Sequence, residues 1–184
     1  MVSSKDLNIS LSFVQKIGVT SVYAGGKGTV VKELARLGAV AIDFDLLARR
    51  VVEPKERAYQ QVIDLLGKDI VTKDGHLDRR EIGRRVFNDD SLLKSLNSII
   101  HPEVRQLAEE MIANEVRQDP KAIFALDIPL LVEADLTQWV DLVVVVDTPY
   151  ELCLKRGQKR DGLSSEEIEA RIKNQLSINE KRKY

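Results

Sequence analysis

Residues 16–38 constrain the fold more than any other stretch, because a strand pattern and a helix pattern meet there through a glycine-rich loop. KIGVTSV (16–22) is an apolar run that predicts a strand, and GTVVKELARLG (28–38) predicts a helix that ends at Gly38. Backbone N–H groups of such a loop point into a concavity at a helix N-terminus, which favours phosphate. The sequence therefore predicts a nucleotide-phosphate site formed by Ala24, Gly25, Gly26, Lys27, Gly28 and Thr29.

The loop departs from the usual pattern of Gly, four residues, then Gly-Lys-Ser/Thr. Ser21 stands at the first glycine, and Gly28 stands where a hydroxyl normally binds Mg²⁺. Thr29 follows, but one step along a helix turns its side chain by about 100°. Thr29 is thus expected to contact phosphate more readily than metal. Ala24 would carry strain of about 1 kcal/mol if its position requires a positive φ. A glycine-rich turn that only joins strand to helix is the alternative interpretation.

Three further apolar runs predict buried strands, because each is continuous and is bounded by polar residues. They are AVAID (39–43), AIFALDIP (122–129) and LVVVVD (142–147). Helical patterns separate these strands, which implies a parallel sheet with right-handed crossovers. We therefore predict an α/β fold in which a parallel sheet is flanked by helices.

A long helical stretch interrupts this alternation at residues 45–118. Within it, one helix is predicted to run from Asp90 or Ser91 through Ile100, and a second to begin at Pro102, a residue favoured at the first helical position. The predicted organisation is an N-terminal extension, 1–16, and one domain, 17–184. The domain core comprises 17–44 and 119–154.

Composition excludes several classes of partner. The 184 residues carry a net charge of −1, so no strong field favours nucleic acid. LVVVV (142–146) is too short to cross a bilayer, and the first sixteen residues do not resemble a secretory signal. The lone Cys153 allows no internal disulfide and is predicted to be a packed thiol. We expect a cytoplasmic protein without nucleic-acid or membrane partners.

From Gly18 onward the order and spacing of segments resembles dephospho-coenzyme A kinase, a family of P-loop kinases of the nucleoside-monophosphate-kinase type. The phosphate loop is the least typical part of this resemblance. The matching segments are AIDFDLLARRVVEP (41–54), DGHLDRREIGRRVF (74–87), IIHPEVR (99–105), LDIPLLVEADL (126–136), DLVVVVDTP (141–149) and KRDGLSSEEIEARIKNQ (159–175).

The resemblance implies a function and a fuller architecture. Such kinases transfer the ATP γ-phosphoryl group to the ribose 3′-hydroxyl of dephospho-coenzyme A, the last step of coenzyme A synthesis, with Mg²⁺. Their fold has a five-stranded parallel core, a helical acceptor-binding lobe, here 45–118, and a lid, here near 155–170. The family continues past the point where this sequence ends at NEKRKY, with a strand and a helix that help to hold adenine. We therefore expect an open sheet edge and an incomplete base pocket.

Two aspartates end predicted strands, where open α/β sheets place their ligands. By the resemblance, Asp43 is the first acid of an Asp-x-Asp motif that orients or deprotonates the acceptor hydroxyl. The alternative is that Asp43 only caps the following helix, although Asp45 is the better cap candidate. Asp127 either holds Mg²⁺ through water or fixes the loop by accepting backbone N–H bonds, and it is also assigned to the acceptor site.

Basic residues complete the predicted site. Lys27 is expected to reach the β- and γ-phosphates and to act in catalysis with Asp43. Arg160, in the lid-like KRDGLS, is assigned to ATP binding and to charge neutralisation during transfer. Arg156 is a second candidate, with a solvated helix face as the alternative. Arg105 is expected to face the pyrophosphate of the acceptor.

Three functions fit these features. The first is an active dephospho-coenzyme A kinase, and the second is a catalytically impaired module of the same fold that binds nucleotide or coenzyme A. The third is a small P-loop kinase with another acceptor, against which the long insertion and DIPLLVE (127–133) argue.

Overall fold

The computed structural model describes residues 15–86 and 89–184. Internal contacts divide the chain into two compact units. The first contains the described residues up to Ile42 together with Lys121–Tyr184, and the second is Asp43–Pro120. NISLSFV (8–14), part of the predicted N-terminal extension, lies outside the described residues.

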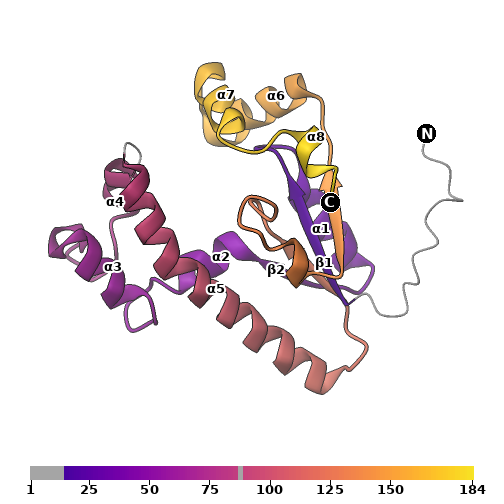
Figure 1. Ribbon diagram of the computed structural model, residues 1–184, viewed down its shortest axis with the longest axis horizontal. Helices are drawn as coiled ribbons and strands as arrows, with labels where there is room; N and C mark the ends of the chain where they lie inside the picture. The colour runs from indigo at the N-terminus through magenta and orange to yellow at the C-terminus, as the bar shows by residue number, and fades with distance from the viewer. Residues whose placement is uncertain (1–14, 87–88) are drawn as a thin grey trace, which may run out of the picture. The chain divides into compact units, whose positions relative to one another are not determined.

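A sheet of four strands organises the first unit (Figure 1). Their order is β2-β3-β1-β4, and β1 pairs in parallel with both of its neighbours. The predicted α/β class with a parallel sheet is confirmed. The described residues contain one strand fewer than the resemblance implies. The strands are β1 (Lys16–Ser21), β2 (Val40–Asp43), β3 (Phe124–Asp127) and β4 (Leu142–Val146).

The strands differ in burial, and this corrects one prediction. β3 is buried at every position, as its apolar sequence predicts. β4 is only half-buried throughout, and β2 buries Ile42 alone. Both lie at an edge of the sheet, where a strand has a neighbour on one side only. The prediction that these apolar runs form buried strands is therefore wrong for the two outer strands.

Two helices of the first unit begin at serine capping boxes. Ser164 and Glu167, a Ser-x-x-Glu pattern in the sequence, form the capping box of α7. Ser177 and Glu180 form another, which starts a separate short helix. Figure 1 shows α6, α7 and α8 gathered beyond the carboxyl ends of β1 and β4. The helices are α1 (Lys27–Arg36), the short 3₁₀ turn η3 (Thr137–Trp139), α6 (Tyr150–Asp161), α7 (Ser165–Lys173) and α8 (Ile178–Lys181).

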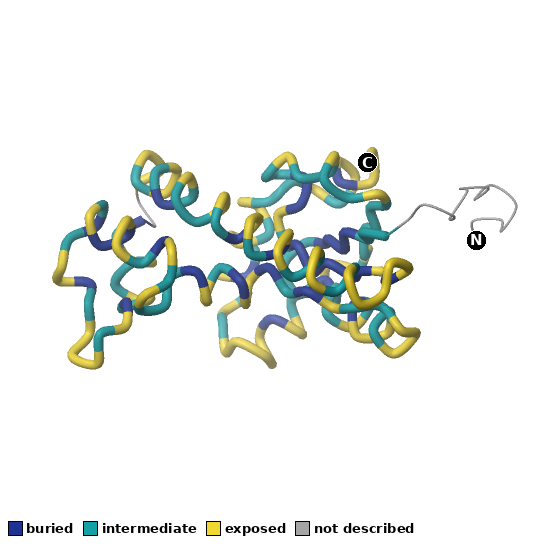
Figure 2. Tube along the Cα trace, turned by 90° about the horizontal axis from the view of Figure 1, so that it is seen from below, coloured by how far each residue is buried: buried dark blue, intermediate teal, exposed yellow. Residues whose placement is uncertain are grey.

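The second unit is helical, and its apolar core includes Val62, Ile70 and Leu96. Along each helix in Figure 2, exposed residues alternate with more buried ones, as expected for helices that pack on one face. Its helices are α2 (Phe44–Arg50), α3 (Tyr59–Leu66), the 3₁₀ turn η2 (Lys68–Ile70), α4 (Arg79–Val86) and α5 (Asp90–Gln118).

The helix α5 corrects a second prediction, because it runs unbroken through Pro102. Proline lacks the N–H that would bond the carbonyl one turn earlier, which costs a helix interior about 3 kcal/mol. Residues on both sides of the proline are buried, among them Leu96 and Val104, and Leu96 belongs to the apolar core of the unit. Tertiary packing thus outweighs the local signal for a new helix start.

In the described part of the chain, no helix combines the length and apolarity that a bilayer crossing requires.

Candidate phosphate-binding site

The loop between β1 and α1 has the backbone of a tight turn into a helix N-terminus. Gly25 N–H donates to the carbonyl of Val22 at 3.0 Å, and Gly26 precedes the helix with φ of +92°. Ala24 has φ of +57°, which is the positive φ at which strain was predicted for this residue. An alanine there costs about 1 kcal/mol relative to a relaxed backbone.

Ser21 is accommodated in this loop by the glycine at position 25. Ser21 is 1% exposed, and its hydroxyl donates to the carbonyl of Val22 at 2.8 Å. A Cβ added at Gly25 would lie 2.9 Å from both Ser21 Cβ and Oγ, which is closer than such atoms approach. The serine that replaces the first glycine of the motif therefore depends on Gly25 for space.

Lys27 and Asp127 form the charged centre of the loop region. Lys27 is the first residue of α1, and Asp127 is the last residue of β3, which pairs with Val19 of β1. The amine lies 2.7 Å from Asp127 Oδ1, and the two side chains are 19% and 12% exposed. This ion pair belongs to neither of the two roles predicted for Asp127, Mg²⁺ binding through water and acceptance of backbone N–H bonds, and both stay predictions. An ion pair this shielded from water is screened less than a surface pair.

Gly28 leaves room beside Asp127. A Cβ added at Gly28 would meet only Asp127 Oδ2 within 4 Å, at 3.8 Å, which is ordinary contact. A side-chain hydroxyl at position 28 would thus face the carboxylate. Thr29, one residue on, is exposed.

The described residues contain no group of three or more His, Cys, Asp or Glu side chains placed to hold a metal ion. Mg²⁺ in kinases is nevertheless bound through one or two carboxylates, substrate phosphates and water. Asp127, a single carboxylate beside the loop, fits that kind of ligand set.

Two candidate arginines of α6 have different surroundings. Arg156 is exposed, yet its Nη1 lies 3.4 Å from the carbonyl of Gly25, so its guanidinium contacts the phosphate loop. Arg160 donates two hydrogen bonds to Asp161, and its guanidinium lies 5.3 Å from the centre of the Tyr23 ring. No role for Tyr23 was predicted from the sequence, although an aromatic residue inside a phosphate loop is the signal that could have identified it.

In the second unit, Asp43 is the N-cap of α2, and its Oδ1 accepts a hydrogen bond from the N–H of Leu46 at 3.1 Å. The preference for Asp45 as the cap is therefore wrong. The helix begins at Phe44, so Asp45 already lies in its first turn. The cap uses Oδ1 of Asp43, and the role predicted for this carboxylate at the acceptor hydroxyl stays a prediction. Arg105 lies on α5 and donates to Glu109 at 3.1 Å.

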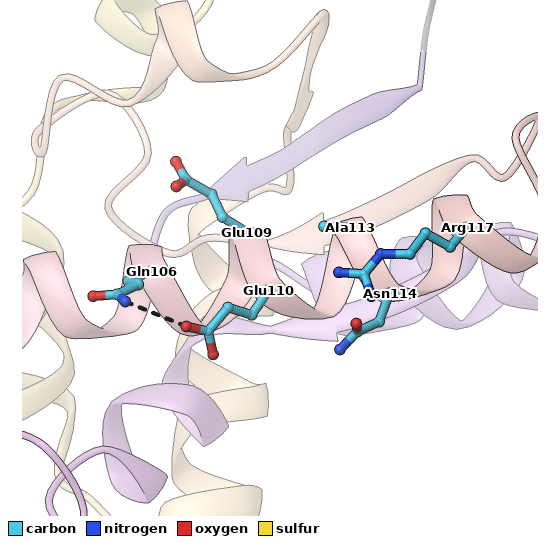
Figure 3. Close-up of a pocket in the computed structure, with 6 residues that line it drawn as sticks. All are labelled: Gln106, Glu109, Glu110, Ala113, Asn114 and Arg117. Carbon is cyan, nitrogen blue, oxygen red and sulfur yellow. Dashed lines mark hydrogen bonds between the residues drawn. The ribbon is translucent and has the colours of Figure 1, made fainter.

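A surface depression of about 440 Å³ lies along α5 (Figure 3). Within it Glu110 accepts a hydrogen bond from Gln106 at 3.3 Å and pairs with Arg57 at 2.7 Å. It contains none of the predicted site residues, so it is distinct from the phosphate loop. Its lining residues are Gln106, Glu109, Glu110, Ala113, Asn114 and Arg117.

Together, a parallel sheet, a glycine-rich loop that opens a helix with lysine, and an aspartate ending the adjacent strand define a P-loop nucleotide-binding protein. The family model described as dephospho-CoA kinase matches residues 15–184. This chain belongs to the dephospho-CoA kinase family.

Relatives and solved structures agree with this assignment. The dephospho-CoA kinase of Carboxydothermus hydrogenoformans is 44% identical over 165 residues, covering 90% of this chain and 80% of the relative. That of Geobacillus kaustophilus is 43% identical over 170 residues, covering 91% and 83%. The structure of dephospho-CoA kinase from Campylobacter jejuni has a TM-score of 0.64 at 31% identity, covering 91% of this chain and 83% of that one. A Thermus thermophilus crystal structure has a TM-score of 0.79 at 36% identity, covering 92% and 84%.

Proposed function

We propose that this protein uses ATP to phosphorylate the ribose 3′-hydroxyl of dephospho-coenzyme A, giving coenzyme A and ADP. The observation that carries the proposal is the Lys27–Asp127 pair at a phosphate loop in a chain of this family. The named relatives are enzymes, which favours turnover over a non-catalytic binding module. Cytoplasm is the proposed compartment, which the single, buried Cys153 supports.

The phosphate loop supplies the ATP site in this proposal. Backbone N–H groups of residues 24–29 bind the phosphate oxygens at the positive end of α1. Lys27 exchanges its contact with Asp127 for the β- and γ-phosphates, since its amine is already at the start of the helix. Arg160 neutralises charge on the transferred group, and the proximity of Arg156 to Gly25 makes it a second cation for this task.

The second unit supplies the acceptor site. Asp43 accepts the proton of the attacking hydroxyl or holds that hydroxyl in line, while Arg105 binds the acceptor pyrophosphate. Bound Mg²⁺ would neutralise charge on the β- and γ-phosphates, with Asp127 as its protein ligand and Thr29 as a further oxygen near the loop.

Gly28→Ser is expected to raise kcat/KM for ATP with Mg²⁺ about tenfold, because the new hydroxyl faces Asp127 where P-loop enzymes bind the metal. Serine also favours the helix over glycine by about 0.5 kcal/mol. Steady-state kinetics at varied Mg²⁺ and thermal unfolding measure the two effects. The matched control is Gly28→Ala, which gains helix stability without a hydroxyl. Equal activity of the two variants would show that the metal ligand is not what position 28 lacks.

The proposed reaction is tested by measuring ADP production with ATP, Mg²⁺ and dephospho-coenzyme A, and by locating the added phosphate with ³¹P NMR. ADP release that depends on the acceptor, with phosphate on the 3′-oxygen, is the expected result. Coenzyme A is the matched control acceptor, because its 3′-hydroxyl is already phosphorylated. Binding of ATP and dephospho-coenzyme A without ADP formation would instead indicate the non-catalytic module, and turnover with nucleoside monophosphates only would indicate a different acceptor.

A further inference from the structure

Tyr23 lies in the phosphate loop, but its side chain is held by the end of α6. Its phenol donates a hydrogen bond to Asp161 Oδ2. Arg160 donates to the same carboxylate at 2.9 and 2.7 Å. The guanidinium carbon of Arg160 also lies 5.3 Å from the centre of the Tyr23 ring, within cation–π range. One tyrosine thus contacts both members of this ion pair.

Residues of α7 and the segment after it hold the other parts of Tyr23. The guanidinium carbon of Arg171 lies 5.2 Å from the ring centre, and the side chain of Gln175 accepts the Tyr23 backbone N–H at 2.7 Å. The helix α6 approaches closely as well, since a Cβ added at Gly157 would lie 3.1 Å from the ring. We call these residues the Tyr23 cluster: Tyr23, Arg160, Asp161, Arg171 and Gln175.

A second connection fastens the same loop two residues further on. The carbonyl of Gly25 accepts hydrogen bonds from Thr148 Oγ1 at 2.7 Å and from Arg156 Nη1 at 3.4 Å. Both donors come from the strand-to-helix connection and α6. The phosphate loop is therefore attached to the helices after β4 through a side chain and through its own backbone.

The charge states needed for the Tyr23 cluster persist at neutral pH. Burial, followed by the hydrogen bond to Asp161, raises the pKa of Tyr23 above its ordinary value of 10.0. The hydrogen bonds from Arg160, and then from Tyr23, lower the pKa of Asp161 from 3.8 to about 2. A raised phenol pKa keeps the donor protonated at neutral pH, and a depressed carboxyl pKa keeps the acceptor ionised there.

We propose that Tyr23 is a positioning residue that fastens the phosphate loop to α6 and α7 and holds Arg160 and Arg171 beside the loop for nucleotide binding. A long arginine side chain loses rotamer freedom when it binds phosphate, and prior ordering removes part of that cost. Tyr23 acts through these neighbours and not on the reacting atoms. The inference rests on the proposed function only in that the loop binds ATP.

The test is calorimetric titration of Tyr23→Phe and Tyr23→Leu with ATP·Mg²⁺ and, separately, with dephospho-coenzyme A. Loss of one hydrogen bond to a charged group is expected to weaken ATP binding by Tyr23→Phe about three- to tenfold. Tyr23→Leu also loses the ring under the arginines and is expected to weaken it further. Affinity for dephospho-coenzyme A should stay within about twofold, which a general loss of folding would not allow.

Coupling within the cluster is tested with Asp161→Asn. In that background Tyr23→Phe should change ATP affinity by less than about twofold, because the shared acceptor is altered. Tyr150→Phe, the same change at an exposed tyrosine of α6, is the matched control and should bind ATP as the wild type does.

Unchanged ATP affinity in Tyr23→Leu, or equal losses for ATP and dephospho-coenzyme A, would overturn the inference. Fully additive losses of ATP affinity from Tyr23→Phe and Asp161→Asn would also overturn the inference. The titrations need no turnover, so weaker ATP binding by the Tyr23 variants supports the inference even if the acceptor assay fails. A wild-type chain that binds no ATP overturns both proposals.

Discussion

Lys27→Met is expected to lower kcat/KM with ATP and dephospho-coenzyme A by about 100- to 1000-fold. The variant removes the charge that lies at the start of α1, and loss of one preorganised electrostatic contact to a transition state typically has this effect. Methionine keeps the length and apolar volume of the side chain, so packing around the loop should change little. Steady-state kinetics with a coupled ADP assay measure the loss.

The control for this variant is Lys32→Met, which removes an exposed lysine from the same helix. Its kcat/KM should remain within about twofold of wild type, since an exposed charge is strongly screened. Lys27→Met also leaves Asp127 without its partner, so thermal unfolding should accompany the kinetics. If Lys27→Met retains more than a third of the activity while Lys32→Met behaves as wild type, the loop does not bind the transferred phosphate.

Asp43→Asn is expected to lower kcat about 100- to 10,000-fold, the range for loss of a general base. Asparagine caps helices as well as aspartate does, so the bond to the N–H of Leu46 should survive and α2 should keep its start. The substitution therefore separates the two roles that Asp43 was given, the cap and the base. Single-turnover kinetics and circular dichroism measure them independently.

Asp45→Asn is the matched control, because Asp45 lies in the first turn of the same helix and not at its cap. It should cost at most about 1 kcal/mol of stability through the helix dipole and leave kcat within about threefold. Similar kcat values for the two variants would remove Asp43 from the chemistry and leave it only as the cap.

The elements that the sequence placed correctly depend on neighbours within a few residues. The start of α7 follows from Ser164 and Glu167, and the loop before α1 follows from Gly26 and Lys27. Where long-range packing decides, the same local rules failed. Pro102 predicted a helix start, yet the helix continues across it because residues on both sides are buried.

The identity of the arginine that reaches the loop also lay beyond the sequence. Arg156 and Arg160 stand one helical turn apart on α6, and both are basic residues in a polar helix. Only the folded chain brings Arg156 to the carbonyl of Gly25 and pairs Arg160 with Asp161 beside Tyr23. Their distinct surroundings come from how α6 packs on the loop, which no spacing rule contains.

The sequence by itself determined the α/β class, the strand–loop–helix of residues 16–38, and the aspartates that end β2 and β3. These follow from hydrophobic periodicity and from hydrogen bonds between close neighbours, both of which short stretches of consecutive residues determine. Only the tertiary structure decided that Lys27 pairs with Asp127, that β4 lies at an edge, and that Tyr23 joins the loop to α6 and α7. Those contacts join segments far apart in the chain, and they form because the sheet order and helix packing bring the segments together.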